Sequence, residues 1–214
     1  MKISKQNIFK AYYWNHAAIR KDLVRLEMIA IKVDLYNANG FQNAHQWFQH
    51  HCKAVLYYYR REKNLLLTEL HKYVPDFKIL MQLIEQLQEV CTTWMPIIDD
   101  SFTLLAMDKE DAVEIEKLKQ ALQKYANATI LFLTQQELLI EEIIGNVNDA
   151  EAINLEKKFL QSMPLEGKVH SLPWVLDAMS ENEKNDLINK LSFKTKLLYN
   201  IKLKSKYYKL VSNL

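Results

Sequence analysis

The sequence predicts an all-α protein in which the first 145 residues form an up-down-up-down four-helix bundle. Three observations support this fold class. Hydrophobic residues make up 49% of the 214 residues, which is enough for a packed core. Turn-forming residues are scarce, with three glycines and four prolines. Four long segments repeat apolar residues in steps of three and four, which is the period of an amphipathic helix.

The first predicted helix covers roughly residues 5–36, and the "NANG" sequence at 37–40 ends it. Gly40 suits the left-handed backbone conformation that often closes a helix. The second helix covers roughly residues 41–73, before Pro75. The inward lines of these two helices contain Ile8, Tyr12, His16, Ile19, Leu23, Leu26, Ala30 and Val33, and then Ala44, Phe48, His51, Val55, Tyr58, Glu62 and Leu66.

The third predicted helix starts near residue 77, and Pro96 is expected to kink it or to thin its hydrogen bonding. The fourth covers roughly residues 109–145 and ends at Gly145. Short connections between four such helices favour antiparallel neighbours in a bundle. The inward lines of this pair contain Leu80, Leu83, Leu87, Cys91, Trp94 and Ile98, and then Ile115, Leu118, Leu122, Tyr125, Thr129, Phe132, Gln136, Leu139 and Ile143.

A C-terminal helical extension, residues 146–214, is expected to pack on the bundle as part of a single domain. It contains a fifth helix at 149–163, a short turn at 172–179, a sixth helix at 180–191 and a basic last helix at 195–214. Ser180 and Glu183 have the spacing of a capping box. The side of the last helix expected to face the bundle consists of Leu197, Leu198, Ile201, Tyr208 and Val211.

The composition excludes several classes of protein. Glycine-rich phosphate loops are absent, so a P-loop or dinucleotide fold is excluded. Cys52 and Cys91 lack the spacing of metal ligands and fit a reducing compartment. The sequence contains no signal peptide or transmembrane segment, so we expect a cytoplasmic, bacterial protein.

The C-terminal end of the chain is basic. From Lys184 onward there are eight lysines against one acid, Asp186. A solvated helix face is the ordinary explanation, although such a helix can also touch an anionic surface. Specific nucleic-acid binding is not expected.

The polar side chains on the predicted inward lines include five that are spread over the four helices: His16, Tyr58, Glu62, Cys91 and Gln136. At about 1.5 Å per residue, their distances from the turns place the first four at one level. His16 lies about 22 residues before the turn near 38, and Glu62 about 24 after it. Gln136 fits less well, because it lies about 29 residues past the turn expected near 107. A polar layer in mid-bundle is typical of a metal site.

The chain resembles the hemerythrin-like (HHE cation-binding) family, whose bundle holds two irons through histidines and carboxylates. "NHAAIRKDLVRLE" is similar to the first helix of that family, in which a ligand histidine precedes Arg and a Leu-rich run. "YYYRRE" stands where the second helix carries "HHxxE", and "FLTQQE" where the fourth carries "HLxxEE". The "LPW" of "SLPWVLDAM" and the Tyr-rich basic end resemble the longer bacterial members.

The resemblance implies that most metal ligands have been replaced in this divergent member. Two donors are kept, His16 and Glu62. The other ligand positions carry Tyr58, Cys91, Phe132 and Gln136. Because a diiron centre needs more histidine and carboxylate donors than this, we expect a degenerate site without a cofactor. The simplest interpretation is a hydrogen-bond network in which Glu62 takes a proton from His16 or Tyr58 and Gln136 completes the layer.

The leading functional hypothesis is a non-catalytic binding protein whose partner, a protein or a small molecule, the sequence does not specify. The first alternative is an iron- or haem-binding protein, of a sensing or storage type, with a reduced ligand set including His16 and Glu62. The second alternative is an enzyme that uses the former metal cavity as a small-molecule pocket. No arrangement of nucleophile, base and acid has a spacing that indicates catalysis.

Two further clusters of polar residues are not assigned to a metal or binding site. A histidine metal cluster is not expected at the start of the second helix, because of His45, His50 and His51 only the last falls on the apolar line. A charged flank facing solvent is expected for Glu137, Glu141 and Glu142.

Overall fold

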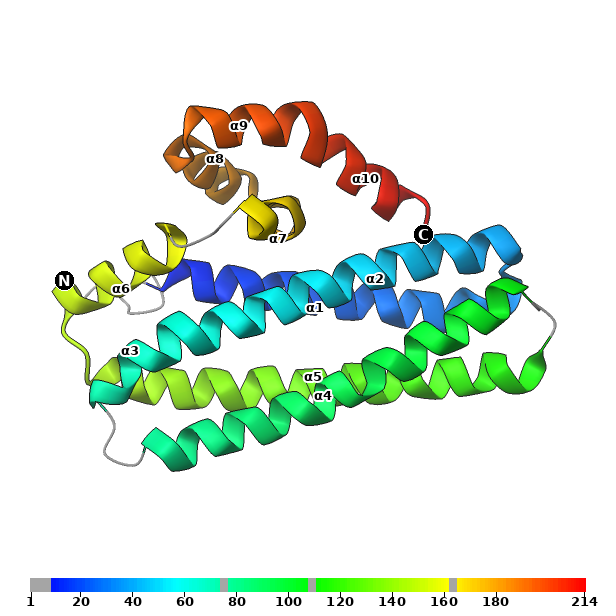
Figure 1. The fold of residues 1–214 in the computed structure, drawn as a ribbon, viewed down its shortest axis with the longest axis horizontal. Helices are drawn as coiled ribbons and strands as arrows, with labels where there is room; N and C mark the ends of the chain where they lie inside the picture. The colour runs from blue at the N-terminus through cyan, green and yellow to red at the C-terminus, as the bar shows by residue number, and fades with distance from the viewer. Residues whose placement is uncertain (1–8, 74–76, 108–110, 162–164) are drawn as a thin grey trace.

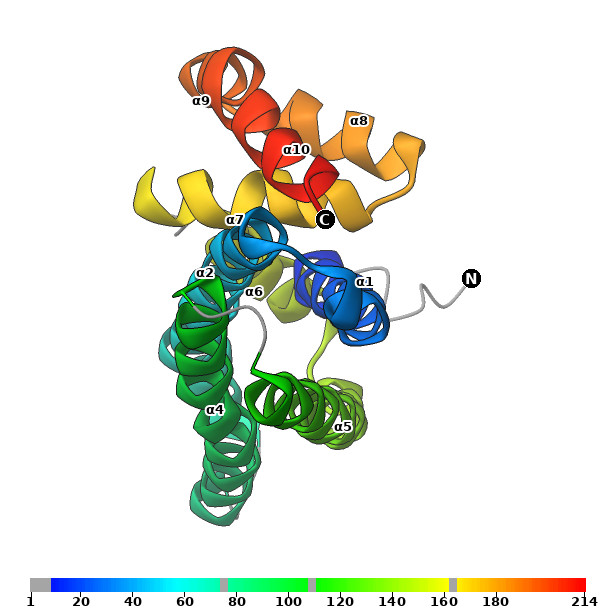
Figure 2. The same ribbon diagram turned by 90° about the vertical axis from the view of Figure 1, so that its right-hand side faces the viewer.

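The computed structural model describes residues 9–73, 77–107, 111–161 and 165–214, and every element within these ranges is helical. Four long helices run side by side, each opposite in direction to the one before it (Figure 1): α1 (Lys10–Lys32), α2 (Ala38–Arg61), α4 (Phe77–Met107) and α5 (Ala112–Gly145). Seen end-on, α1 and α2 lie next to the C-terminal helices and α4 and α5 lie farther from them (Figure 2), and buried side chains of all four belong to one apolar core. Helix α5 contacts both α4 and α1, and α2 contacts α4. The all-α prediction is therefore confirmed.

The connection between α1 and α2 differs from the sequence prediction. A 3-10 turn, Val33–Leu35, follows α1, and Asn37 caps α2 by accepting a hydrogen bond from the Gly40 backbone N–H at 2.9 Å. Gly40 does not adopt a positive φ, so the expected left-handed stop is wrong. Its place is instead inside the first turn of α2, where a Cβ would lie only 3.1 Å from the Tyr36 side chain.

The end of α2 is irregular at Glu62. A π-helical turn, Glu62–Leu67, follows Arg61 and leads through α3 (Thr68–Leu70) into a 3-10 turn, His71–Tyr73. The chain is thus helical as far as residue 73, as predicted, while Pro75 lies outside the described residues. A π turn contains an extra residue, which changes the direction of the following side chains, and such turns are frequent at functional sites.

Helix α5 begins later than the sequence suggested. Asp111 caps it, accepting hydrogen bonds from the backbone N–H groups of Val113 and Glu114 at 3.0 and 2.9 Å. Gln136 therefore lies 24 residues after Ala112, and Glu62 lies 24 residues after Ala38. Because both helices start at the same end of the molecule, this places Gln136 level with Glu62 and removes the expected mismatch (Figure 1).

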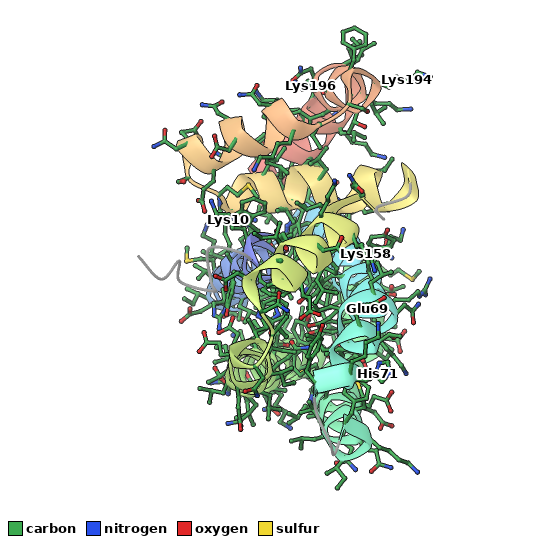
Figure 3. All side chains as sticks on the ribbon, turned by 90° about the vertical axis from the view of Figure 1, so that its left-hand side faces the viewer. Lys10, Glu69, His71, Lys158, Lys194 and Lys196 are labelled. Carbon is green, nitrogen blue, oxygen red and sulfur yellow. The ribbon has the colours of Figure 1, made fainter. Side chains whose placement is uncertain are left out.

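The helices after α5 lie over one side of the four long helices: α6 (Asp149–Gln161), α7 (Leu165–Ala178), α8 (Glu181–Lys190), α9 (Phe193–Leu198) and α10 (Lys204–Ser212). Helix α7 packs on both α1 and α2 (Figure 2). Helix α6 lies near α3, and Lys158 Nζ is 3.5 Å from Glu69 Oε1 (Figure 3). The predicted capping box of Ser180 and Glu183 is present at the start of α8.

The short turn expected at 172–179 is wrong, because these residues continue helix α7 through Pro173. Proline lacks the backbone N–H that the helix would use, which costs one hydrogen bond. The residues on either side of it, Leu172 and Trp174, are buried, as are Val175 and Leu176. Burial of these large apolar side chains against α1 and α2 outweighs the lost hydrogen bond.

The inward face predicted for the last helix is wrong at three of its five residues, whereas Leu198 and Val211 are partly buried against the core. Of its five residues, Ile201 is 70% exposed, and Leu197 and Tyr208 are exposed as well. A second π turn, Tyr199–Leu203, separates α9 from α10 and inserts an extra residue in the turn. The buried face recurs every fourth residue instead and consists of Thr195, Tyr199, Leu203 and Tyr207. Among the lysines of this segment, Lys194 is exposed on the outer side of α9 (Figure 3).

Candidate functional site in the polar layer of the core

The six residues that the family resemblance places at ligand positions are all buried. They come from the four long helices and the π turn after α2, and none is more than 2% exposed: His16, Tyr58, Glu62, Cys91, Phe132 and Gln136. Four of them form one cluster, since Gln136 and Tyr58 interact with Glu62, and His16 packs edge-on against Tyr58 with 5.6 Å between ring centres. These four make up the polar layer.

The centre of the polar layer is a hydrogen bond between two side chains. The amide Nε2 of Gln136 donates to Oε2 of Glu62 at 2.8 Å. Burial raises the pKa of Glu62 to about 8, although the Gln136 amide and the Tyr58 hydroxyl both act against this shift. Glu62 therefore holds a proton near neutral pH, which removes the cost of a buried, unpaired carboxylate.

The two ring nitrogens of His16 have different surroundings. Nε2 faces the polar layer, and Nδ1 contacts Glu137 outside it. Its Nδ1 lies 2.7 Å from Oε1 of Glu137, and Arg20 binds the same carboxylate through two nitrogens at 2.6 and 2.8 Å. Although burial acts in the opposite direction, hydrogen bonds from His16 and Arg20 lower the pKa of Glu137 to about 2. Burial lowers the pKa of His16, so the ring is neutral with its hydrogen on Nδ1 and an acceptor at Nε2.

Glu137 corrects one sequence prediction. It was expected on a charged flank facing solvent, but it is only partly exposed and it orients a core histidine. Its neighbour Glu141 is exposed and accepts a hydrogen bond from the Tyr13 hydroxyl at 3.1 Å. The signal that sequence reasoning missed is the spacing of His16 and Arg20, four residues apart on one helix face, which presents two donors to one acid.

Several polar atoms around the layer have no hydrogen-bond partner within the described part of the chain. These atoms are the hydroxyls of Tyr12 and Tyr59, Nε2 of His16, Oε1 of Glu62 and Oε1 of Gln136. The Tyr58 hydroxyl belongs with them, because it lies near Glu62 without reaching hydrogen-bond geometry. Burial also raises the pKa of Tyr58 well above its usual value, with Glu62 adding to the shift. Buried polar atoms are normally satisfied, so this cluster indicates a place for ordered water or a small polar ligand.

Cys91 and Phe132 do not join the hydrogen-bonded part of the layer. The Cys91 thiol donates to the backbone carbonyl of Leu87 at 3.2 Å, and burial raises its pKa to about 11. Phe132 packs edge-on against Tyr59 with 5.1 Å between ring centres. Both positions therefore contribute packing to the core.

The residues present do not fit a diiron centre. Within the described ranges, no group of three or more His, Cys, Asp or Glu side chains is placed to hold a metal ion. The Cys91 thiol and the Tyr58 phenol are hard to deprotonate, and Gln136 directs its amide hydrogens at Glu62. Two iron ions would need several more anionic donors than this layer supplies.

A second buried polar network lies along α1 toward α7, and sequence reasoning missed most of it. Asp22 is 1% exposed and accepts hydrogen bonds from His51 Nδ1 at 2.8 Å, Trp174 Nε1 at 2.7 Å and Arg25 at 2.7 Å. Because Nδ1 of His51 donates to Asp22, Nε2 accepts the hydrogen bond from the Tyr125 hydroxyl at 2.7 Å. The network ties α1, α2 and α5 to α7.

The three histidines near the start of α2 have separate partners. His45 lies 2.7 Å from Asp99 on α4, His51 belongs to the Asp22 network, and the His50 ring packs against those of His170 and Tyr207. Burial lowers the pKa of His50 to about 4. The expectation of no shared histidine metal site stays a prediction, and these contacts agree with it.

A large groove lies elsewhere on the molecule. It has a volume of about 690 Å³ between α1 and α5, and its lining includes Val24, Ile31 and Ile130. None of the six core residues described above lines this groove.

Comparison of the chain with protein-family models, with curated proteins and with solved structures finds no match. Within residues 9–73, 77–107, 111–161 and 165–214, no helix combines the length and the apolar composition that crossing a bilayer requires.

Proposed function

We propose that this chain is a non-catalytic binding protein with a hemerythrin-like four-helix bundle, in which a polar layer has replaced the diiron site. The four antiparallel long helices support an up-down-up-down bundle, with residues 146–214 as an extension packed on it. His16 and Glu62, the two donors that the resemblance retains, both belong to one buried layer.

The observation that carries this proposal is the hydrogen bond from Gln136 to Glu62 at 2.8 Å. An amide nitrogen presents hydrogens with partial positive charge, so a cation on that side of Glu62 would meet repulsion. The raised pKa of Glu62 supports the same interpretation, because a proton satisfies the buried carboxyl without a metal ion. In place of metal chemistry, the layer acts as a structural hydrogen-bond network.

A second candidate function rests on two unpartnered atoms. Nε2 of His16 and Oε1 of Glu62 are both free to accept a ligand. This favours, as an alternative, a protein that holds a single metal ion or a haem through His16 and Glu62. A carboxylate and a neutral imidazole are ordinary ligands for iron or zinc.

Elemental analysis of protein purified without a metal-binding tag separates the two candidates. The degenerate-site proposal expects no stoichiometric metal in the wild type, and the same result for His16→Gln and Glu62→Gln. One metal ion or haem per chain that is lost in both variants supports the second candidate. Two irons per chain, with the absorption bands of an oxo-bridged ferric pair, would overturn both.

The non-catalytic role has its own test in the host organism. If the layer is structural, the isosteric Glu62→Gln protein folds and complements a deletion of the gene as well as the wild type does. Loss of complementation by a Glu62→Gln protein that is folded and normally abundant would mean that Glu62 has a chemical role.

A further inference from the structure

A small cavity lies where the C-terminal extension meets the four long helices. It has a volume of about 50 Å³, and its walls come from α1, the end of α2, α6, α7 and the region of α8. Most of the lining is apolar and includes Trp14, Leu172 and Leu187. Three polar side chains also line it: Asn15, Arg61 and Ser171.

Each of these three polar residues is at least nine-tenths buried and has an atom without a partner. Asn15 is 3% exposed, Ser171 1% and Arg61 6%. The Nδ2 of Asn15 donates a hydrogen bond to the backbone carbonyl of Ala11 at 2.5 Å. Its Oδ1 is left without a donor. Ser171 Oγ and Arg61 Nε are likewise without partners in the described part of the chain. Three helices therefore each place one polar atom without a hydrogen-bond partner at the same cavity.

The charge on Arg61 is the dominant feature of this cavity. One terminal nitrogen donates to the backbone carbonyl of Phe159, and the guanidinium carbon lies 3.8 Å above the centre of the Phe159 ring. Among the side chains that the structure describes, which do not include those of Leu165, Glu166 and Lys168, no carboxylate lies within 4.0 Å of this guanidinium. Glu156 acts on its charge only from farther away, and one oxygen of Glu156 already accepts from the Ala11 N–H at 2.8 Å.

We propose that this cavity binds a short-chain carboxylate, with its oxygens accepting hydrogen bonds from Arg61 Nε and Ser171 Oγ. A buried cation without an ion pair is costly, and a small anion would compensate it. A volume of 50 Å³ holds about four water-sized groups, which matches the non-hydrogen atoms of a two-carbon carboxylate such as acetate. Its alkyl part packs against the leucines, and Oδ1 of Asn15 accepts from a hydroxyl if the ligand carries one.

The position of the cavity gives the ligand a structural effect. Arg61 and Asn15 belong to the long helices, while Ser171 belongs to α7. A carboxylate held by residues of both parts stabilises the packing of the extension, because it binds only when α7 is in place. This inference does not depend on the metal content of the polar layer.

Acetate is the probe for the test, with sodium chloride at the same ionic strength and neutral acetamide as reference solutes. Trp14 lines the cavity and donates to Glu183 Oε1 at 3.0 Å, so tryptophan fluorescence reports occupancy. We expect saturable binding of acetate, a rise in Tm that chloride and acetamide do not give, and tighter binding of glycolate because of Asn15. An equal effect of chloride or acetamide would overturn the proposal.

Two variants locate the site. Arg61→Gln should weaken acetate binding at least about tenfold, the typical loss for a charged hydrogen bond. Arg60→Gln changes the neighbouring exposed arginine and should leave binding unchanged. If Arg61→Gln fails to fold, Ser171→Ala takes its place and should weaken binding about three- to tenfold. Unchanged acetate binding in a folded Arg61→Gln or Ser171→Ala protein, or no saturable binding to the wild type, would disprove the site.

Discussion

Arg25 on α1 and Asp177 on α7 form an ion pair, with 2.6 Å between Nη2 and Oδ2, that joins the long helices to the C-terminal extension. The same guanidinium donates to Asp22 at 2.7 Å, and Lys21 approaches Asp177 to 3.0 Å. Although partial burial acts in the opposite direction, hydrogen bonds from Arg25 and Lys21 lower the pKa of Asp177. The extension is therefore held by partly buried charges as well as by apolar packing.

Asp177→Asn should loosen the extension. The change removes the anion between two cations and leaves Arg25 with less compensation, at a cost of about 1–3 kcal/mol. For a chain of this size, Tm falls by roughly 2–4 °C for each kcal/mol. Thermal unfolding followed by circular dichroism measures the effect. Asp186→Asn, which changes an exposed aspartate on α8, serves as the control, and an equal fall in both variants would contradict the pairing.

The register of the last helices can be tested with two neighbouring positions. Leu203 is 4% exposed, whereas Ile201 is 70% exposed. Leu203→Ala should lower the free energy of unfolding by about 2–5 kcal/mol, because it leaves a cavity. Ile201→Ala should change it by less than about 0.5 kcal/mol. Urea unfolding of both variants measures the two free energies. If the apolar line predicted from the sequence were the buried one, Ile201→Ala would be the more destabilising change.

Glu156 should make stability depend on pH. Burial raises the pKa of Glu156 to about 7 from its usual 4.5, although the Ala11 N–H opposes the shift. The folded state therefore keeps a proton that the unfolded chain loses. Its stabilising contribution is full below pH 4.5 and is lost as the pH rises to 7. One pKa unit corresponds to about 1.4 kcal/mol, and screening at a partly exposed group reduces the total to about 2 kcal/mol.

The measurement for Glu156 is the difference in unfolding free energy between the wild type and Glu156→Gln from pH 4 to 8. The wild type should lose stability relative to Glu156→Gln across this range. Glu142→Gln, at an exposed position on α5, should follow the wild type. A wild type that gains stability relative to Glu156→Gln as the pH rises would show that the sign of the shift is wrong.

The proposed relationship to the hemerythrin-like family predicts that introducing the donors of that family creates iron binding. The variant Tyr58→His, Cys91→His, Phe132→His and Gln136→Glu supplies imidazoles and a carboxylate beside His16 and Glu62, whereas each single change should do little. Without iron the fourfold variant should be less stable, since it buries more unpaired polar groups, and iron should raise its Tm by linkage. Adding His16→Ala should remove the iron, and a variant that binds iron equally well without His16 would place the metal elsewhere.

The sequence predicted the long helices well, because their apolar periodicity is regular over more than twenty residues. It also selected the six core positions, which are all buried. The late start of α5 was missed because Asp111, its N-cap, can equally well be read as part of a helix. The continuation of α7 through Pro173 could not be seen in the sequence, since it depends on tertiary burial that outweighs a local preference.

Partner choice was the least predictable feature of the core. Glu137 follows Gln136 and looks like an exposed flank residue, yet it binds His16 from the edge of α5. Asp22 gains its partners from residues 29 and 152 positions away, His51 and Trp174. Periodicity indicates which face of a helix is buried, but it says nothing about which distant side chain will meet a charge there. The same limit explains the error in the last helices, where a π turn changed the register.

The Asp22 network has a consequence for how the chain acquires its structure during synthesis. Trp174 supplies one of the donors to a carboxylate that is almost completely inside the core. While a ribosome is still making residues before 174, α1 and α2 can pack together only with this acid incompletely satisfied or still open to water. The nascent helices should therefore remain loosely associated until α7 emerges, and full protection of their backbone amides should appear late in translation.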